Sequence, residues 1–310
     1  MTKVAPPNAD AACGTSVRVG PSPRAGAVSG LTLLEQNDSD VYDAILGEER
    51  RQSESVELIP SENYTYPEVL AALGSVLTDK YAEGYPGRRY YGGNTFSDRV
   101  EELARERACR LFRAEHANVQ ALSGSPMNQA AYLALLEPGE TILAMDLSHG
   151  GHLTHGAPVS HMARIFNFAR YRTRQEDGGI DEKELLRLAR EARPKLVLCG
   201  YTSYPRDYDY AMFRRVADDV GARLMADVSH VGGLIAGGAL ANPFDHGADV
   251  VTTTTHKTLR GPRAGITRDG RNRKSPAGAR HSRQLWHRWS ARRERAGTRW
   301  HDLQQAGHPR

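Results

Sequence analysis

Short apolar runs alternate with amphipathic segments through most of the chain, and this alternation limits the possible folds more than any other feature. The apolar runs have the length of strands, and the segments between them repeat apolar residues at helical spacing. Strands that alternate with helices indicate a parallel sheet covered on both faces. We therefore predict an α/β fold in which helices flank a mainly parallel sheet. The expected strands are 141–147, 164–170, 195–200, 223–230 and 249–257, and the expected helices are 38–54, 67–77, 97–113, 126–136, 181–192 and 210–222.

The last expected strand consists of β-branched residues and ends on a lysine. It reads "VVTTTTHK" from Val250 to Lys257 and continues as "TLRGPR" to Arg263. Valine and threonine favour a strand, but threonine on both faces is typical of neither an amphipathic nor a plainly apolar strand. Lys257 at the end of such a strand is either a solvated charge or a functional amine, and its neighbours must decide between the two.

Polar clusters lie where the expected strands end and where one of the expected helices begins. Sheets of this type bind ligands beyond the carboxyl ends of their strands. We therefore expect these clusters to converge on one pocket. They are "SGSPMN" (123–128), "DLSHGGHLTHG" (146–156), "YTSYP" (201–205), Asp227 with His230, and His256 with Lys257.

The residue types in these clusters match the needs of pyridoxal phosphate. A Ser-Gly-Ser turn at a helix start offers backbone N–H groups to a phosphate. Asp227 at one strand end can pair with a protonated pyridine nitrogen, and Lys257 at another can form a Schiff base. Each signal alone also fits an ordinary capped turn, a capping aspartate or a solvated lysine. Their combination favours the cofactor site.

Four long motifs resemble the serine hydroxymethyltransferase family, which comprises fold-type I pyridoxal phosphate enzymes. They are "ELIPSENY", "DKYAEGYPGRRYYGGN", "HGGHLTHG" and "VVTTTTHKTLRGPRAG", and the resemblance runs from about Leu31 to Ile266. It implies the fold-type I large domain over 31–266 and pyridoxal 5'-phosphate as cofactor. The implied reaction is the reversible transfer of the serine hydroxymethyl group to tetrahydrofolate, which gives glycine and 5,10-methylenetetrahydrofolate.

The resemblance also implies a role for each matching residue. For the cofactor, Lys257 would form the Schiff base, Asp227 would bind the pyridine nitrogen and His152 would stack on the ring. The phosphate would be bound by Ser123, Gly124 and Ser125, and by Tyr81 across a dimer interface. The phenolic oxygen and the nearby carboxylate would be contacted by Thr202 or Ser203 and by His230. His256 and Arg263 would surround the lysine. Glu83 would be the acid–base group across that interface, and Tyr91 would lie beside the reacting carbon. Ser61 would contact the amino acid substrate. The folate would be contacted by Leu147, Gly151 and Leu153.

Several of these residues also have simpler interpretations. Tyr91 and its neighbour Tyr90 could be packed aromatic residues, and Glu83 could be a surface charge. We expect the remaining histidines of the motif region to be structural or exposed, namely His149, His155 and His161. The three cysteines are too few and too scattered to indicate a disulfide framework or a zinc site, so we expect no metal.

The two ends of the chain differ from the middle in composition. Residues 1–30 are rich in Ala, Pro, Gly and Ser, and we expect them to be disordered. Residues 267–310 contain 12 Lys and Arg against 3 Asp and Glu, together with all three tryptophans. The family resemblance stops after Ile266, and no position matches the arginine with which the family's C-terminal domain binds the substrate carboxylate. A shifted reading frame would explain this change, and we then expect poor solubility and little activity.

Two other classes of function remain open at this stage. A natural basic tail with tryptophans could bind nucleic acid through charge and stacking, although we do not expect such a partner. Another fold-type I enzyme, such as a threonine aldolase, could share the cofactor chemistry but not the tyrosine-rich motif. With no apolar signal core and no apolar run of about 18 residues, we expect a cytoplasmic protein. The family resemblance implies that the chain, if folded, forms a homodimer or larger homo-oligomer.

Overall fold

The computed structural model describes residues 30–269, which fall into two units that are taken separately. Within the described residues, the first unit contains α1 (Gly30–Asn37) and α2 (Ser39–Glu54). Asp38 caps α2, because its side chain accepts a hydrogen bond from the backbone N–H of Val41 at 3.2 Å. This confirms the helix expected over 38–54. The predictions for residues 1–29 and 270–310, including most of the basic tail, concern residues outside the described part of the chain.

The second unit begins at Ile59 and opens with short elements that lead to a long helix. The tyrosine-rich motif forms a small hairpin, which is held by one buried arginine. Arg89 pairs with Asp98 at 2.7 Å and with Glu101 at 2.8 Å, both in the long helix. The elements are α3 (Pro67–Leu73), η1 (Val76–Asp79), β1 (Gly84–Tyr85), β2 (Arg88–Arg89) and α4 (Thr95–Phe112).

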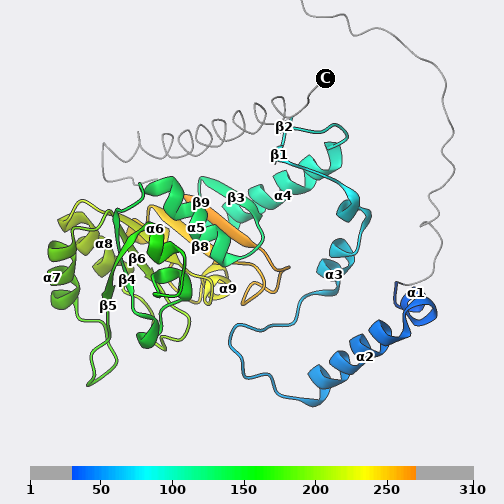
Figure 1. Cartoon of the computed structure of the whole chain (residues 1–310), viewed down its shortest axis with the longest axis horizontal. Helices are drawn as coiled ribbons and strands as arrows, with labels where there is room; N and C mark the ends of the chain where they lie inside the picture. Colours follow the sequence, from blue (N-terminus) through cyan, green and yellow to red (C-terminus); the bar gives the residue numbers. More distant parts are fainter. Residues whose placement is uncertain (1–29, 270–310) are drawn as a thin grey trace, which may run out of the picture. The chain divides into compact units, whose positions relative to one another are not determined.

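A seven-stranded, mainly parallel sheet forms the centre of this unit, which confirms the expected fold class (Figure 1). The strand order is β3-β9-β8-β7-β6-β4-β5. Strands β8, β7, β6, β4 and β5 are parallel neighbours, whereas β9 is antiparallel to both β3 and β8. The strands are β3 (His116–Ala121), β4 (Thr141–Met145), β5 (Asn167–Tyr171), β6 (Leu196–Gly200), β7 (Arg223–Asp227), β8 (Val250–Thr254) and β9 (Gly265–Asp269).

Both faces of the sheet are covered, and the alternation of side chains along β6 shows this directly. Val197 and Cys199 belong to a core cluster with α7, α8 and α9, whereas Leu196 and Leu198 belong to a second cluster with α5 and α6. Such two-sided burial explains why the parallel strands read as continuous apolar runs. Figure 1 shows α7 and α8 next to one another beside this part of the sheet. The connecting helices are α5 (Gly124–Leu135), η2 (Leu147–His149), η3 (Leu153–His155), α6 (Met162–Ile165), α7 (Glu182–Ala192), α8 (Tyr210–Asp219), α9 (Gly232–Ala236) and η4 (Pro243–His246).

Several expected boundaries are wrong. The elements β4, β7, β8 and α8 end two or three residues earlier than expected, and two further differences have a local cause. The helix expected over 67–77 ends at Leu73, because Gly74 caps it and its N–H bonds to the carbonyl of Leu70 at 3.0 Å. The strand expected over 164–170 begins only at Asn167, because Met162–Ile165 form a helical turn. The sequence did not predict β3 or β9, and β9 extends past Ile266 to Asp269.

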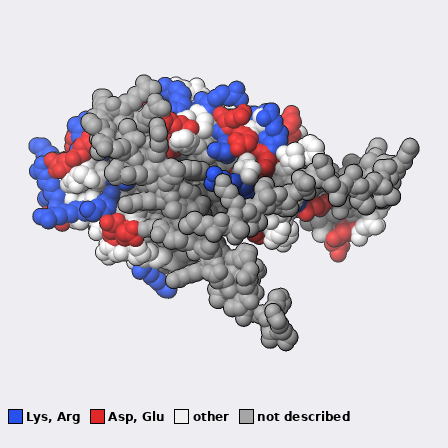
Figure 2. Space-filling view, turned by 90° about the horizontal axis from the view of Figure 1, so that it is seen from above, with Lys and Arg blue, Asp and Glu red and all other residues white. Residues whose placement is uncertain are grey.

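Two surface properties bear on the kinds of partner that the chain can have. None of the helices in the described part is both long and apolar enough to cross a membrane. On the face shown in Figure 2, Lys and Arg side chains lie interspersed with Asp and Glu side chains among the described residues. This part of the surface is therefore not uniformly basic.

Candidate active site

A pocket lies at the carboxyl ends of β6, β7 and β8, where parallel sheets place their ligand sites. Ten of the residues singled out from the sequence line it: Ser123, Gly124, Ser125, His152, Thr202, Asp227, His230, His256, Lys257 and Arg263. Four further residues complete the lining, namely Asn128, Tyr201, Ser229 and Thr254. The polar clusters that lie far apart in the sequence thus converge on one pocket, as their positions at strand ends predict.

The N-terminus of α5 forms one side of this pocket. Ser123 is the N-cap residue, and the backbone leaves the first turn of the helix open towards the pocket. Gly124 lies so close to β8 that an added β carbon would be 2.8 Å from Cγ2 of Thr254. The close approach explains the glycine, and free N–H groups at a helix start can bind an anion such as a phosphate.

Gly265 supports this turn from the neighbouring strand β9. A β carbon at Gly265 would lie 2.5 Å from the carbonyl oxygen of Ser123. We expect Gly265→Ala to lower the free energy of unfolding by about 1–3 kcal/mol, because the backbone of Ser123 must move. The displaced turn should also weaken binding of pyridoxal phosphate. Urea unfolding and cofactor titration measure the two effects. Gly92→Ala is the matched control, since its β carbon meets nothing within 4 Å, and equal results for both variants would contradict this role.

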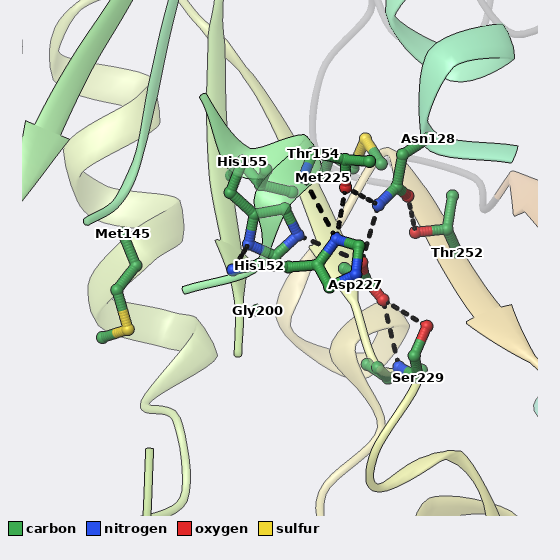
Figure 3. Close-up of polar contacts among 12 residues, drawn as sticks. Asn128, Met145, His152, Thr154, His155, Gly200, Met225, Asp227, Ser229 and Thr252 are labelled. Carbon is green, nitrogen blue, oxygen red and sulfur yellow. Dashed lines mark hydrogen bonds and ion pairs between the residues drawn. The ribbon is translucent and has the colours of Figure 1, made fainter. Parts of the chain in front are cut away.

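Asp227 is buried at the end of β7 and accepts four hydrogen bonds (Figure 3). Oδ2 accepts from Nδ2 of Asn128 at 2.7 Å and from Nε2 of His155 at 3.1 Å. Oδ1 accepts from the backbone N–H and the hydroxyl of Ser229, at 3.1 and 2.6 Å. Burial opposes the charge of Asp227, but the hydrogen bonds from His155, Ser229 and Asn128 outweigh it and lower its pKa. The carboxylate is therefore ionised at neutral pH.

His155 belongs to the site although the sequence placed it among the structural or exposed histidines. Its side chain is buried, and its Nδ1 accepts the backbone N–H of His152 at 3.2 Å. The ring proton must then lie on Nε2, which donates it to Asp227. The partners of Asp227 are thus amide, hydroxyl, backbone and imidazole donors, and none of those in the described chain is a lysine or arginine.

The amine of Lys257 lies beside His230, with Nζ and Nε2 3.1 Å apart. Burial lowers the pKa of Lys257, while the charge of Asp227 partly opposes this shift. Burial and the neighbouring Lys257 lower the pKa of His230 to about 4. A lysine with a lowered pKa reaches its neutral, nucleophilic form more readily.

We expect two pocket histidines to make the free energy of unfolding depend on pH. Burial lowers the pKa of His152 and of His230 from 6.5 to about 4. Between these two values the unfolded chain binds more protons than the folded chain, so stability rises with pH. We expect the urea midpoint to increase steadily from about pH 4 to pH 6.5 and then to level off. A His152→Gln, His230→Gln double variant should flatten this rise, and an unchanged rise would contradict the assignment.

Thr202 and Ser203 were alternatives for the same contact, and only Thr202 lines the pocket. The backbone N–H of Thr202 donates to the carbonyl of Gly150 at 2.7 Å, which fixes the turn after β6. Its hydroxyl is buried and has no hydrogen-bond partner among residues 30–269. An unsatisfied buried hydroxyl is costly, so this atom fits a polar group of a bound ligand. Ser203 is exposed.

Three residues expected at the site lie on the exposed tyrosine-rich segment instead. Tyr81, Glu83 and Tyr91 are exposed and do not line the pocket. The rings of Tyr81 and Tyr91 meet edge to face, with their centroids 6.0 Å apart. The action of Tyr81 and Glu83 across a dimer interface stays a prediction.

The other residues expected to contact substrates do not line the pocket. Ser61 is half-buried, and two residues later Asn63 donates its amide to the backbone carbonyl of Lys257 at 3.0 Å. Leu147 and Leu153 are exposed on the consecutive turns η2 and η3, with Gly151 buried between them. In the described part of the chain, no group of three His, Cys, Asp or Glu side chains is arranged to hold a metal ion.

The comparisons with known proteins agree with the motifs quoted from the sequence. Residues 34–284 match the family model described as serine hydroxymethyltransferase. A serine hydroxymethyltransferase of Synechococcus sp. (strain JA-3-3Ab) is 55% identical over 241 residues, which cover 77% of this chain and 55% of that relative. The chain thus spans about half the length of this curated relative. The family match extends past Ile266 to residue 284.

Proposed function

Since this chain belongs to the serine hydroxymethyltransferase family, we propose that its pocket binds pyridoxal 5'-phosphate for the family's reaction. In that reaction the hydroxymethyl group of serine passes reversibly to tetrahydrofolate, which yields glycine and 5,10-methylenetetrahydrofolate. The observation that carries the proposal is the buried, ionised Asp227 in the same pocket as the partly buried amine of Lys257.

The residues of the pocket fit this cofactor at each of its polar ends. The turn Ser123–Ser125 at the start of α5 offers backbone donors to the phosphate. The unpaired hydroxyl of Thr202 offers a hydrogen bond to a polar group on the ring. Asp227 has a full set of hydrogen-bond donors, and none of those among the described residues is a lysine or an arginine, which leaves its charge available to a protonated pyridine nitrogen.

The chain's own residues then have separate tasks. Bound pyridoxal phosphate supplies an aldehyde that condenses with amines and a ring that accepts electrons from a bond broken at the amino acid. Lys257 holds the cofactor, and its lowered pKa favours the neutral amine. Asp227 would keep the proton on the ring nitrogen, and His152, the residue that caps η3, would stack on the ring. His230 and His256 stay neutral at pH 7 because burial lowers the pKa of each.

The outer residues point to a site completed by a second copy of the chain. We propose that Glu83 manages protons and Tyr81 contacts the phosphate from a partner subunit, whereas Tyr91 and Ser61 contact the amino acid. Exposed apolar side chains on the same segment support self-association, since Tyr81, Tyr90 and Phe96 expose 71, 67 and 78% of their surface. Leu147, Gly151 and Leu153 would contact the folate from η2 and η3.

Two measurements test the proposal at two levels. Pyridoxal phosphate added to the folded protein should give a visible absorption band that is distinct from that of the free cofactor. Serine should then yield glycine in a reaction that depends on tetrahydrofolate. Absence of the band would contradict the cofactor site, while folate-independent cleavage would favour an aldolase. A band without folate-dependent glycine would leave only the cofactor assignment standing.

A further inference from the structure

Asn128 is a buried residue of the pocket to which the proposed chemistry assigns no task. It lies one turn into α5 with 1% of its surface exposed. Its side chain makes three hydrogen bonds, to three different elements of the fold. Nδ2 donates to Oδ2 of Asp227 at 2.7 Å and to Oγ1 of Thr154 at 2.9 Å, and Oδ1 accepts from Oγ1 of Thr252 at 2.8 Å.

The surroundings determine which way the amide faces. Asp227 is a carboxylate that only accepts hydrogen bonds, so the NH₂ end of Asn128 must face it. The amide oxygen then faces Thr252, whose hydroxyl has to donate its proton there. Thr252 is one of the buried threonines of β8. This contact explains why a buried strand carries a hydroxyl on the face that meets α5.

The second N–H of the Asn128 amide is linked to the ring of His152 through the hydroxyl of Thr154. Oγ1 of Thr154 accepts from Asn128, and it lies 2.7 Å from Nδ1 of His152. The backbone N–H of Thr154 also donates to Nδ1 at 3.2 Å. Nδ1 is therefore the acceptor, and the Thr154 hydroxyl donates to it. The network seen in Figure 3 thus runs from Thr252 through Asn128 to both Asp227 and His152.

We propose that Asn128 is a positioning residue that fixes Asp227 and His152 as one unit, with Thr252 setting the orientation of its amide. The proposal rests on the proposed function, because these two side chains are the ones that would contact the edge and the face of the cofactor ring. If Asp227 and His152 are held rigidly relative to one another, they hold the cofactor ring in one orientation. Two side chains that moved independently would not.

The test compares two variants with a matched control. Asn128→Leu keeps the size of the side chain but removes all three hydrogen bonds, and Thr252→Val removes only the donor to the amide oxygen. Asn242→Leu is the control, since Asn242 is also buried and bonds to the carbonyl of Phe112 at 2.8 Å, outside the pocket. It should cost stability without changing the site.

The first readout needs no cofactor. In Asn128→Leu the hydroxyl of Thr154 can turn and accept a proton from His152, so the pKa of His152 measured by NMR should rise by about 0.5–1 unit. The charged and titratable groups that act on this ring are His155, Asp227, Lys257 and His230, and all four are retained. Thr252→Val should shift the pKa in the same direction by a smaller amount.

The second readout uses the bound cofactor. Asn128→Leu should bind pyridoxal phosphate about tenfold more weakly or worse and lose at least about half of the visible circular dichroism of the bound ring. A His152 titration and a dichroism signal equal to those of Asn242→Leu would overturn the positioning role. Failure of the unaltered protein to bind the cofactor would instead overturn the proposed function. In that case the His152 titration still decides whether Asn128 couples the two side chains.

Discussion

Replacing Lys257 with alanine will abolish the borohydride-stable attachment of pyridoxal phosphate to the protein. Among the described residues that line the pocket, Lys257 is the only lysine. Its amine is partly buried and lies 3.1 Å from Nε2 of His230, and the loss of solvation lowers its pKa. These conditions favour a neutral amine that condenses with an aldehyde. Mass spectrometry of the reduced and digested protein should show the pyridoxyl mass on the Lys257 peptide of the unaltered chain and background labelling in the variant.

Lys195→Ala provides the control for this experiment. Lys195 is exposed and directly precedes β6, at the opposite edge of the sheet from the pocket. Its removal should leave the labelling of Lys257 unchanged. A label that persists in Lys257→Ala, or that maps to a different lysine in the unaltered protein, would show that this amine does not carry the cofactor.

The sequence predicted the sheet and the pocket because both follow from local patterns. Apolar runs such as Leu196–Gly200 indicate a strand that is buried on both faces of the sheet. The polar residues that follow such strands must lie together at the carboxyl ends of the parallel strands. The buried threonines of β8 could not be explained in this way. Thr252 donates to Asn128, and Thr254 packs where Gly124 leaves room for it. Both partners lie on α5, far away in the sequence.

The parts that were not predicted depend on contacts between distant segments. Asn128 and Asp227 are 99 residues apart, and His155 and Asp227 are 72 residues apart. Neither distance leaves a signal in local composition or spacing, so His155 was read as structural or exposed. The antiparallel strand β9 was missed for a similar reason. Its residues Gly265–Asp269 become a strand only by pairing with β3 and β8.

Replacing Asp227 with asparagine will leave the cofactor attached but will remove the proton from its ring nitrogen. Asparagine has nearly the same shape and can still accept hydrogen bonds from His155 or Ser229, but it carries no charge. A carboxylate next to a cation shifts the pKa of that cation by about 1–3 units. The protonated fraction of the ring should therefore fall by roughly 10- to 1,000-fold at neutral pH. Activity should fall with it, because the protonated ring is the electron acceptor.

The protonation state can be measured directly by NMR with cofactor labelled with ¹⁵N at the ring nitrogen. Ser229→Ala is the matched control, because it removes one hydrogen bond to Asp227 at 2.6 Å but keeps the charge. Its ring should stay protonated. Borohydride should still label Lys257 in Asp227→Asn, since loss of the carboxylate removes the charge that raises the pKa of this amine. The two residues thus have separable effects, attachment at Lys257 and ring protonation at Asp227. A ring nitrogen that remains protonated in Asp227→Asn would show that the carboxylate does not face it.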